Sequence, residues 1–286
     1  MSTRTTPSTR PQTSAPRLLN FIGIAALLFS AAPAFAQLLG TASNFAVLGS
    51  TPNITNTGAS VISGSVGIYP AASITGFPPG LIVPGTGVFH AADAVALQAQ
   101  SDNTAAYGVL AGLTGASISP TLGGQTLVPG VYNAGAADLT GALTLDGPGL
   151  YVLQATSLTT ASGPGASSVV LINGATPCDV WWQIGSSATI GTFSVVKGNM
   201  LALTSITIGT SANLQGRALV QTGTVTLASN AVSACAGGST TGFTVPAVTS
   251  AISTGIPSLS TWALLLLTGL LALAGVAAVG RKVKRV

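Results

Sequence analysis

The sequence predicts a mainly β protein that winds into a β-solenoid, with one long helix packed along it. Three observations support this fold class: a pattern of short strands that recurs every 18 or 19 residues, a scarcity of charged residues, and a proline-free stretch over residues 90–113. Only 5% of the 286 residues are charged, against roughly a quarter in an average globular protein. Such a repeat is typical of chains that stack one coil of strands on the next.

Residues 1–36 have the organisation of a secretory signal peptide. A basic stretch ends at Arg17, an apolar core follows over residues 18–29, and Ala34-Phe35-Ala36 fits the small-x-small cleavage pattern. A buried N-terminal helix is the alternative for the same apolar run. We expect export, with the mature domain covering residues 37–236 and a linker over residues 237–255.

Residues 256–286 predict a membrane helix followed by a basic cluster. The apolar run that ends at Gly280 is roughly 28 Å long as a helix, enough for one bilayer crossing. The basic residues within 281–285 favour the cytoplasmic side of the membrane. A plain membrane anchor explains these features by themselves.

The start of this segment also resembles a known sorting signal. Residues 256–262, Ile-Pro-Ser-Leu-Ser-Thr-Trp, are similar to the IPTL-type C-terminal signals of Gram-negative bacteria, although Ser258 replaces the usual Thr and Thr261 stands where an acidic residue is common. The resemblance implies an exosortase-like membrane protease as a partner that recognises and removes the tail. With or without removal, we expect an exported domain, at the cell surface or secreted, held to the inner membrane transiently or permanently.

The distribution of charge argues against nucleic-acid binding. Seven of the nine cationic residues flank the two apolar end segments: Arg4, Arg10, Arg17, Arg281, Lys282, Lys284 and Arg285. The middle keeps Lys197 and Arg217 against five aspartates, a balance of 2 − 5 = −3. A domain with this balance cannot form a phosphate-binding surface.

The same scarcity leaves little material for catalysis. A catalytic triad, a metal site or an acid–base pair needs several convergent Asp, Glu, His, Cys or Lys side chains. A polysaccharide-cleaving solenoid would have to rely on Asp138, Asp146, Lys197 and Arg217, which are too few for a clustered carboxylate site. We therefore expect no enzyme, no metal and no cofactor.

Each coil of the repeat contains three short strands of different character. The first is apolar on both sides, as in residues 200–203, and must therefore be covered twice. A helix over about residues 90–113 is the expected second cover, because apolar residues recur there at helical spacing. We expect a structural role for His90, near the start of that helix, because Asp93 is the only other ligand-type residue nearby.

The second strand of each coil alternates an inward apolar residue with an outward hydroxyl. Stacking the coils predicts a first outward file made of Thr55, Thr140, Thr159, Thr189, Thr207 and Thr226. A second file, two residues earlier, contains Asn53, Ser157, Ser187, Ser205 and Thr224, and is interrupted by Asp138. Residues 73–75, Ser-Ile-Thr, are a candidate for one more coil.

Two such files form a nearly regular grid, because coils stack about 4.7–4.9 Å apart and alternate residues lie roughly 6.7 Å apart. Threonine has few side-chain rotamers and presents a methyl beside a hydroxyl, so the grid can order water. A lattice of water, ice, is the partner that such a surface suits. The alternative is a surface adhesin or matrix protein with a passive face, since Ser and Thr suit any exposed strand.

Several stretches resemble the ice-binding-protein-like domain of bacteria and fungi, in order over about residues 38–235. They are residues 44–49 (Asn-Phe-Ala-Val-Leu-Gly), 55–58, 76–80, 90–94, 129–132 (Pro-Gly-Val-Tyr), 170–175, 178–189 and 198–207. The resemblance implies an irregular right-handed β-solenoid of triangular cross-section with a helix alongside. It also implies adsorption to ice through a flat Ser/Thr-rich face, without cofactor or chemistry; the choice of face comes from the stacking above. Residues 41–44 match a Thr-Ala-x-Asn motif of some members.

Cys178 and Cys235 are the two cysteines of the chain, and both lie in the exported part. A single pair in an oxidising compartment predicts a disulfide, with two free buried thiols as the alternative. We expect the domain to act as a monomer.

Overall fold

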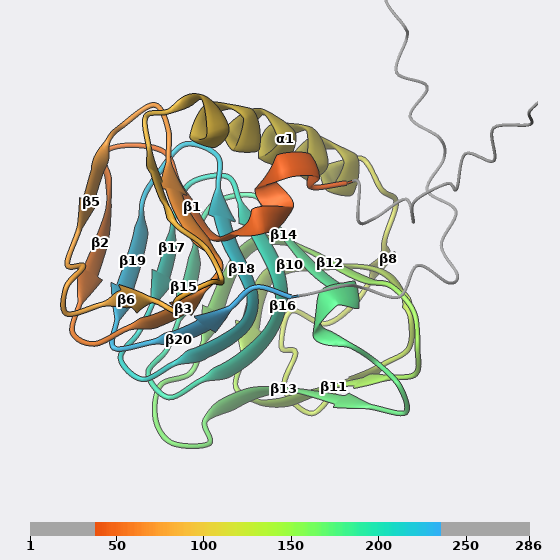
Figure 1. The fold of residues 1–286 in the computed structure, drawn as a ribbon. Coiled ribbons are helices and arrows are strands. Elements are labelled where there is room, and N and C mark those ends of the chain that lie inside the picture. Colours follow the sequence, from red (N-terminus) through yellow and green to blue (C-terminus); the bar gives the residue numbers. More distant parts are fainter. Residues whose placement is uncertain (1–37, 236–286) are drawn as a thin grey trace, which may run out of the picture.

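The computed structural model describes residues 38–235 and shows a solenoid of stacked coils whose strand pairs are all parallel (Figure 1). Each coil passes through three faces, which we call A, B and C in chain order. The predicted signal peptide (1–36), linker (237–255) and sorting segment (256–286) lie outside the described residues. No helix within residues 38–235 combines the length and apolar character that crossing a bilayer requires.

Face A is the side against which the helix packs. Its strands, in spatial order, are β7 (Phe89–Ala91), β4 (Ser65–Ile68), β1 (Phe45–Gly49), the second halves of β18 (Asn213–Val220) and β16 (Val195–Ala202), β14 (Val180–Ile184), the first halves of β12 (Tyr151–Thr160) and β10 (Gly130–Leu139), and β8 (Ala116–Ser117).

Faces B and C complete each coil. Face B contains β5 (Ser73–Thr75), β2 (Asn53–Thr57), β19 (Val225–Ala228), β17 (Ile206–Ile208), β15 (Ala188–Ile190) and the second halves of β12 and β10. Face C contains β6 (Leu81–Ile82), β3 (Val61–Ser63), β20 (Ala231–Ser233), the first halves of β18 and β16, β13 (Ser167–Ile172), β11 (Gly141–Asp146) and β9 (Thr126–Leu127). Two 3-10 turns, η1 (Gly40–Asn44) and η2 (Pro177–Asp179), precede β1 and β14.

The coils do not stack in the order of the sequence. The first coil lies beside the last one, with Val47 of β1 opposite Ala218 of β18, Thr55 of β2 opposite Thr226 of β19, and Ile62 of β3 opposite Val232 of β20. We call this contact between the two ends of the domain the seam. Helix α1 (Ala94–Ala111) then carries the chain along face A from β7 to β8, at the other end of the solenoid (Figure 1).

Glycines allow the corner between faces C and A to be tight. Strands β16 and β18 each turn this corner at a glycine with positive φ, Gly198 at +114° and Gly216 at +156°. The two are stacked, and a Cβ on Gly216 would lie 1.9 Å from the carbonyl oxygen of Gly198. Only glycine permits both the backbone conformation and the close approach.

Two apolar cores hold the fold together. One fills the interior between the three faces and includes Ile54, Leu158, Trp182 and Ile206. The other lies between face A and the helix, where Trp181, Leu201 and Leu219 pack with residues such as Ala99, Ala106 and Leu110 of α1. The expected second cover of the doubly apolar strands is thus confirmed.

The helix is shorter than the predicted range of 90–113. Asp93 caps it by accepting a hydrogen bond from the backbone nitrogen of Ala96 at 2.8 Å, so the helix begins at Ala94. His90 lies in β7 opposite Gly67, and its Nδ1 contacts Oδ2 of Asp93 at 2.8 Å. The bonds from Ala96 and His90 hold the pKa of Asp93 below its ordinary value. Strand pairing therefore takes the residues before Asp93 out of the helix.

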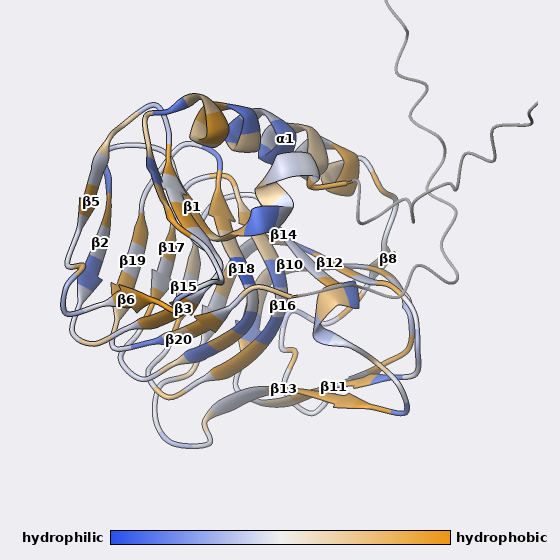
Figure 2. Ribbon diagram, in the orientation of Figure 1, coloured by the Kyte–Doolittle hydropathy of each residue, from blue (hydrophilic) through white to orange (hydrophobic). Residues whose placement is uncertain are grey.

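Polar side chains fix the position of α1 on face A. Gln100 Nε2 donates to the carbonyl of Gly49 at 2.7 Å, and Asn103 Nδ2 donates to that of Val220 at 3.1 Å. From the sheet, Gln154 Nε2 donates to the carbonyl of Leu110 at 2.8 Å. The ribbon of α1 accordingly alternates between polar and apolar residues (Figure 2). These bonds connect the helix to coils on both sides of the seam.

We expect Leu201→Ala to lower the free energy of unfolding by about 2–5 kcal/mol, because Leu201 is completely buried between the sheet and α1 and its truncation leaves a cavity. Leu203→Ala is the matched control: that leucine lies two residues later, is 40% exposed, and should change stability by only about 0.5 kcal/mol. Urea unfolding followed by circular dichroism measures both. Equal losses in the two variants would show that the helix–sheet core does not stabilise the fold as described.

Candidate functional site

Face B presents one outward threonine at the same position of successive strands. The register places Thr75 opposite Thr55 and Thr55 opposite Thr226, and continues strand by strand through the same positions: Thr226, Thr207, Thr189 and Thr159. We call this row the threonine file. The residues that follow or precede them, such as Ile54, Val225 and Ile206, are completely buried, so the alternation predicted for this strand is present.

A second row of polar residues runs parallel to the threonine file, two positions earlier in each strand. It contains Ser73, Asn53, Thr224, Ser205, Ser187 and Ser157, and we call it the serine file. Backbone bonds continue the ladder at these positions, from Ile206 N to the carbonyl of Thr224 at 3.1 Å and from Ala188 N to that of Ser205 at 2.9 Å. Face B therefore carries a two-row hydroxyl array.

Thr140 does not belong to the threonine file, which corrects the prediction. Asp138 lies opposite Thr159, and Ala136 lies opposite Ser157 in the serine file. The two Thr residues were matched as if 19 residues separated equivalent positions, whereas the paired residues here are 21 apart (159 − 138). Thr140 instead donates from Oγ1 to Oδ1 of Asp138 at 2.9 Å.

Two further threonines extend the array at its ends. Thr75, proposed from the sequence as part of another coil, pairs next to Thr55. Thr121, which the sequence reasoning missed, forms an isolated parallel bridge with Asp138 and continues the file beyond it. The sequence Ser119-Pro120-Thr121 shares the hydroxyl-x-Thr spacing of the other coils and could have indicated this position.

Most hydroxyls of the threonine file are available to water. Within residues 38–235, the Oγ1 atoms of Thr55, Thr159, Thr189, Thr207 and Thr226 form no hydrogen bond with the protein. In contrast, hydroxyls along the corner between faces A and B bond to the neighbouring coil: Thr222 Oγ1 donates to the carbonyl of Leu203 at 2.8 Å, and Ser186 Oγ to that of Thr156 at 2.7 Å. The edge of face B is thereby fixed while its flat part remains free to bind.

The seam runs through the middle of the array and is fastened by polar contacts. On face B, Thr224 Oγ1 donates to the backbone oxygen of Asn53 at 2.5 Å. At the opposite corner, the 7% exposed Arg217 donates to the carbonyls of Ser43 at 2.7 Å and Cys235 at 2.8 Å, and to Oδ1 of Asn199 at 2.7 Å. Burial lowers the pKa of Arg217. Arg217 was expected on the outer surface; it instead joins both ends of the domain.

The two cysteines meet at the same corner between faces C and A. Cys178 and Cys235 are both half-buried thiols in the structure, and their side chains share a hydrogen bond. That bond lowers the pKa of Cys235 and raises the pKa of Cys178. The fold therefore brings together two residues 57 positions apart in the sequence (235 − 178).

The charged residues considered for a hydrolytic site are not gathered. Asp138 lies on face B, Asp146 and Lys197 lie on face C, and Arg217 is buried at the corner between faces C and A. Within residues 38–235, no three His, Cys, Asp or Glu residues are placed to hold one metal ion. Asp138 is the only charged side chain on the described part of face B.

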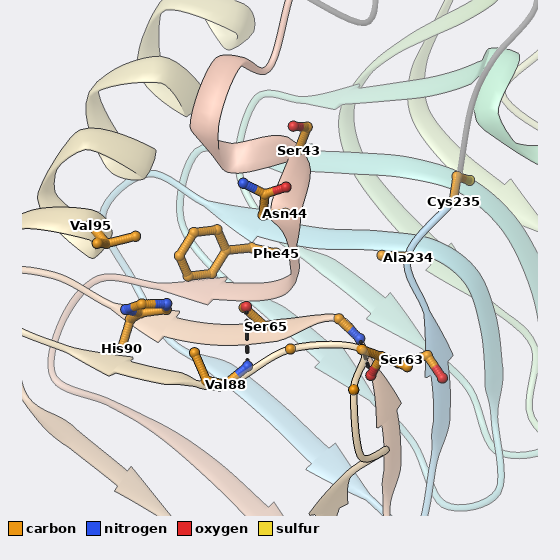
Figure 3. A pocket seen from close by; sticks show the side chains of 14 residues that line it. Ser43, Asn44, Phe45, Ser63, Ser65, Val88, His90, Val95, Ala234 and Cys235 are labelled. Atoms are coloured by element: carbon orange, nitrogen blue, oxygen red, sulfur yellow. Dashed lines mark hydrogen bonds between the residues drawn. The ribbon is translucent and has the colours of Figure 1, made fainter.

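A cavity of about 840 Å³ opens near the start of the helix, away from face B (Figure 3). His90 packs against Phe45 there, with ring centroids 5.4 Å apart, and Ser65 Oγ accepts a hydrogen bond from the backbone nitrogen of Val88 at 3.3 Å. The lining is mainly Gly, Ser and apolar side chains, with Cys235 at its edge. Its polar side chains make contacts that belong to the packing of β1, β4 and β7.

Comparison with known proteins identifies relatives over the whole described domain. The family model described as ice-binding-like matches residues 47–233. An ice-binding protein of Nostoc sp. (strain HG1) is 47% identical over 229 residues, which span 76% of this chain and 81% of that protein. The crystal structure of an ice-binding protein from an Antarctic biological consortium is 40% identical, with a TM-score of 0.64 over 68% of this chain and 90% of the other. A structure from the Antarctic ascomycete Antarctomyces psychrotrophicus has the same identity and TM-score, over 70% of this chain and 98% of the other.

Proposed function

We propose that this chain, which belongs to the ice-binding-like family, is an antifreeze protein that adsorbs to ice and inhibits its growth and recrystallisation. The observation that supports a specific surface is the two-row hydroxyl array of face B, with its protein-free threonine hydroxyls. The relatives are themselves named ice-binding proteins, which disfavours a passive adhesin or matrix solenoid. Adsorption of this kind needs neither a catalytic group nor a cofactor.

The array matches the requirements of a water-ordering surface. Its rows repeat at the strand spacing of about 4.7–4.9 Å, and its two files lie roughly 6.7 Å apart. Threonine methyl groups favour cage-like water, while the free Oγ1 atoms can hydrogen-bond part of it. Because the side chains are β-branched and stand on a paired sheet, little rotamer freedom remains to be lost on binding. We propose Thr55, Thr159, Thr189, Thr207, Thr226 and the serine file as the ice-contacting residues.

Adsorbed molecules then act as obstacles on the crystal surface. Ice grows between them as curved fronts, and the curvature lowers the local freezing point. The same obstacles block the transfer of water between crystals that underlies recrystallisation. One copy presents the whole array, so we propose that the domain acts as a monomer.

We also propose that Cys178 and Cys235 form a disulfide in the exported protein. Their side chains already share a hydrogen bond, and the carbonyl of Cys235 is held by Arg217 at 2.8 Å. A bridge there would fasten the last coil next to the seam. In the chain-entropy description, closing a loop of 57 residues stabilises by roughly 4 kcal/mol.

The position of the chain ends suits a tethered protein. One guanidinium, that of Arg217, contacts both Ser43 and Cys235, so the described chain begins and ends near the corner between faces C and A. In Figure 1 the coloured ribbon ends on the side away from β2, β19 and β17. We propose that the domain is exported by residues 1–36 and held at the membrane through residues 256–286, with an exosortase-like protease acting on that tail. Face B then points away from the membrane.

Thr207→Tyr should abolish thermal hysteresis and the inhibition of recrystallisation, because a bulky ring at the centre of the threonine file prevents close contact with a flat lattice. Gln215→Tyr is the matched control, since Gln215 is exposed on face C. Both variants should keep the circular dichroism spectrum of the parent chain. Full activity of Thr207→Tyr, or equal loss in both variants, would exclude face B as the ice-contacting surface.

Oxidised protein should contain no thiol that reacts with an alkylating reagent after denaturation, as measured by mass spectrometry. Cys178→Ser should then lower the free energy of unfolding by roughly 4 kcal/mol relative to the oxidised parent, because the loop closure is lost. Adding a reductant to the parent should produce the same loss, and should leave Cys178→Ser unchanged. Two reactive thiols in protein purified from the periplasm would contradict the disulfide.

A chain that ends at residue 255 should be released into the medium, whereas the full chain should remain with the cells. Fractionation and immunoblotting measure the distribution, and cells carrying the full chain should attach to ice. The full chain with Thr207→Tyr should stay on the cells but lose the attachment. The same distribution for both chain lengths would refute the tether.

A further inference from the structure

Asp138 interrupts an otherwise uniform surface. From Thr75 to Thr159, six successive strands place a threonine in the file, and Thr121 resumes it on the far side of Asp138. On the same strand the serine-file position is held by Ala136, which has no hydroxyl. One strand therefore differs from its neighbours at both positions of the array.

We propose that Asp138 sets the boundary of the ice-contacting patch, so that contact extends over the six strands from β5 to β12 and stops there. The inference rests on the proposed function of face B. It assigns to Asp138 the role of a limiting residue: its charge determines how far along the face a crystal surface can approach.

The chemistry of the carboxylate explains the limit. Asp138 is half-buried, and the only protein hydrogen bond to its side chain within the described residues comes from Thr140 Oγ1, at 2.9 Å to Oδ1. The remaining lone pairs are solvated, and water held by a carboxylate is oriented by the charge. Confining that group against a solid lattice removes hydration without supplying a cationic partner, which is costly for an ionised group. Contact with ice is therefore unfavourable at this strand.

The boundary also fixes where the patch is centred. The six uninterrupted strands include β2 and β19, which form the seam, so the contacting surface is built from both ends of the domain. Thr121 is separated from them by Asp138 and does not join the patch. If the charge is the barrier, its removal should connect the two parts into eight consecutive threonine positions.

The test is Asp138→Thr in the otherwise unchanged chain, with thermal hysteresis and recrystallisation inhibition measured at equal molar concentration. We expect an increase of roughly one third, the ratio of eight strands to six, because a surface-driven effect scales with contact area. Asp138→Asn should give a smaller gain, since it removes the charge without adding a threonine methyl group.

Asp146→Thr is the matched control. Asp146 is also a half-buried strand aspartate that accepts one side-chain hydrogen bond, from Asn173 Nδ2 at 2.6 Å, but it lies on face C. It changes the net charge equally and should leave activity unchanged. Thermal unfolding of each variant shows whether the fold is kept.

The outcomes separate this inference from the proposed function. An inactive parent chain, or an active Thr207→Tyr variant, would refute the function of face B itself. An active parent with an inactive Thr207→Tyr variant, but no gain for Asp138→Thr, would refute only the boundary. A loss of activity in a folded Asp138→Thr variant would show that the carboxylate contributes to ice contact, which is the opposite of the proposal. An equal gain in Asp146→Thr would assign the effect to net charge.

Discussion

The parallel hydrogen-bonded ladder between successive coils is the constraint on which the rest of this structure depends. It fixes which residue of each strand points inward, and it sets the distance between equivalent side chains on neighbouring coils. The interior then selects Ile, Val and Leu at the inward positions, while the outward positions are left to form a surface. A flat array arises because the register is kept from strand to strand, across the seam as well as along the chain.

The helix and the low charge answer two problems that this ladder creates. Face A is apolar on both sides, and α1 covers the outer side with small residues while Gln100 and Asn103 bond to strand carbonyls. Face B has the opposite requirement, because charged side chains would impose their own hydration on it. The few charged groups accordingly lie on α1, on face C or at the corner between C and A, with Asp138 as the exception.

The sequence alone predicted the solenoid, the helix and most of the array, because all three depend on local periodicity. It placed Thr159, Thr189, Thr207 and Thr226 in one file through a constant repeat length. It misplaced Thr140 because β10 departs from that length, with register shifts around Gly135. It gave Arg217 an outer position because the seam pairs residues far apart, and no local pattern indicates which coil will dock on which. The helix start was too early because pairing of His90 with β4 overrides helical spacing.

The seam has a consequence for the order in which the molecule can fold. Its partners are separated by 171 residues between Val47 and Ala218 (218 − 47), so closing it is the step with the largest loop entropy. Coils between β8 and β20 can add to one another as they emerge during synthesis, but the first coil has no neighbour on that side until the last one is complete. Until then both edges are open strands, which are templates for pairing with other chains. A chain that stops before β18 therefore lacks its last coil and also leaves its first coil without a place to dock.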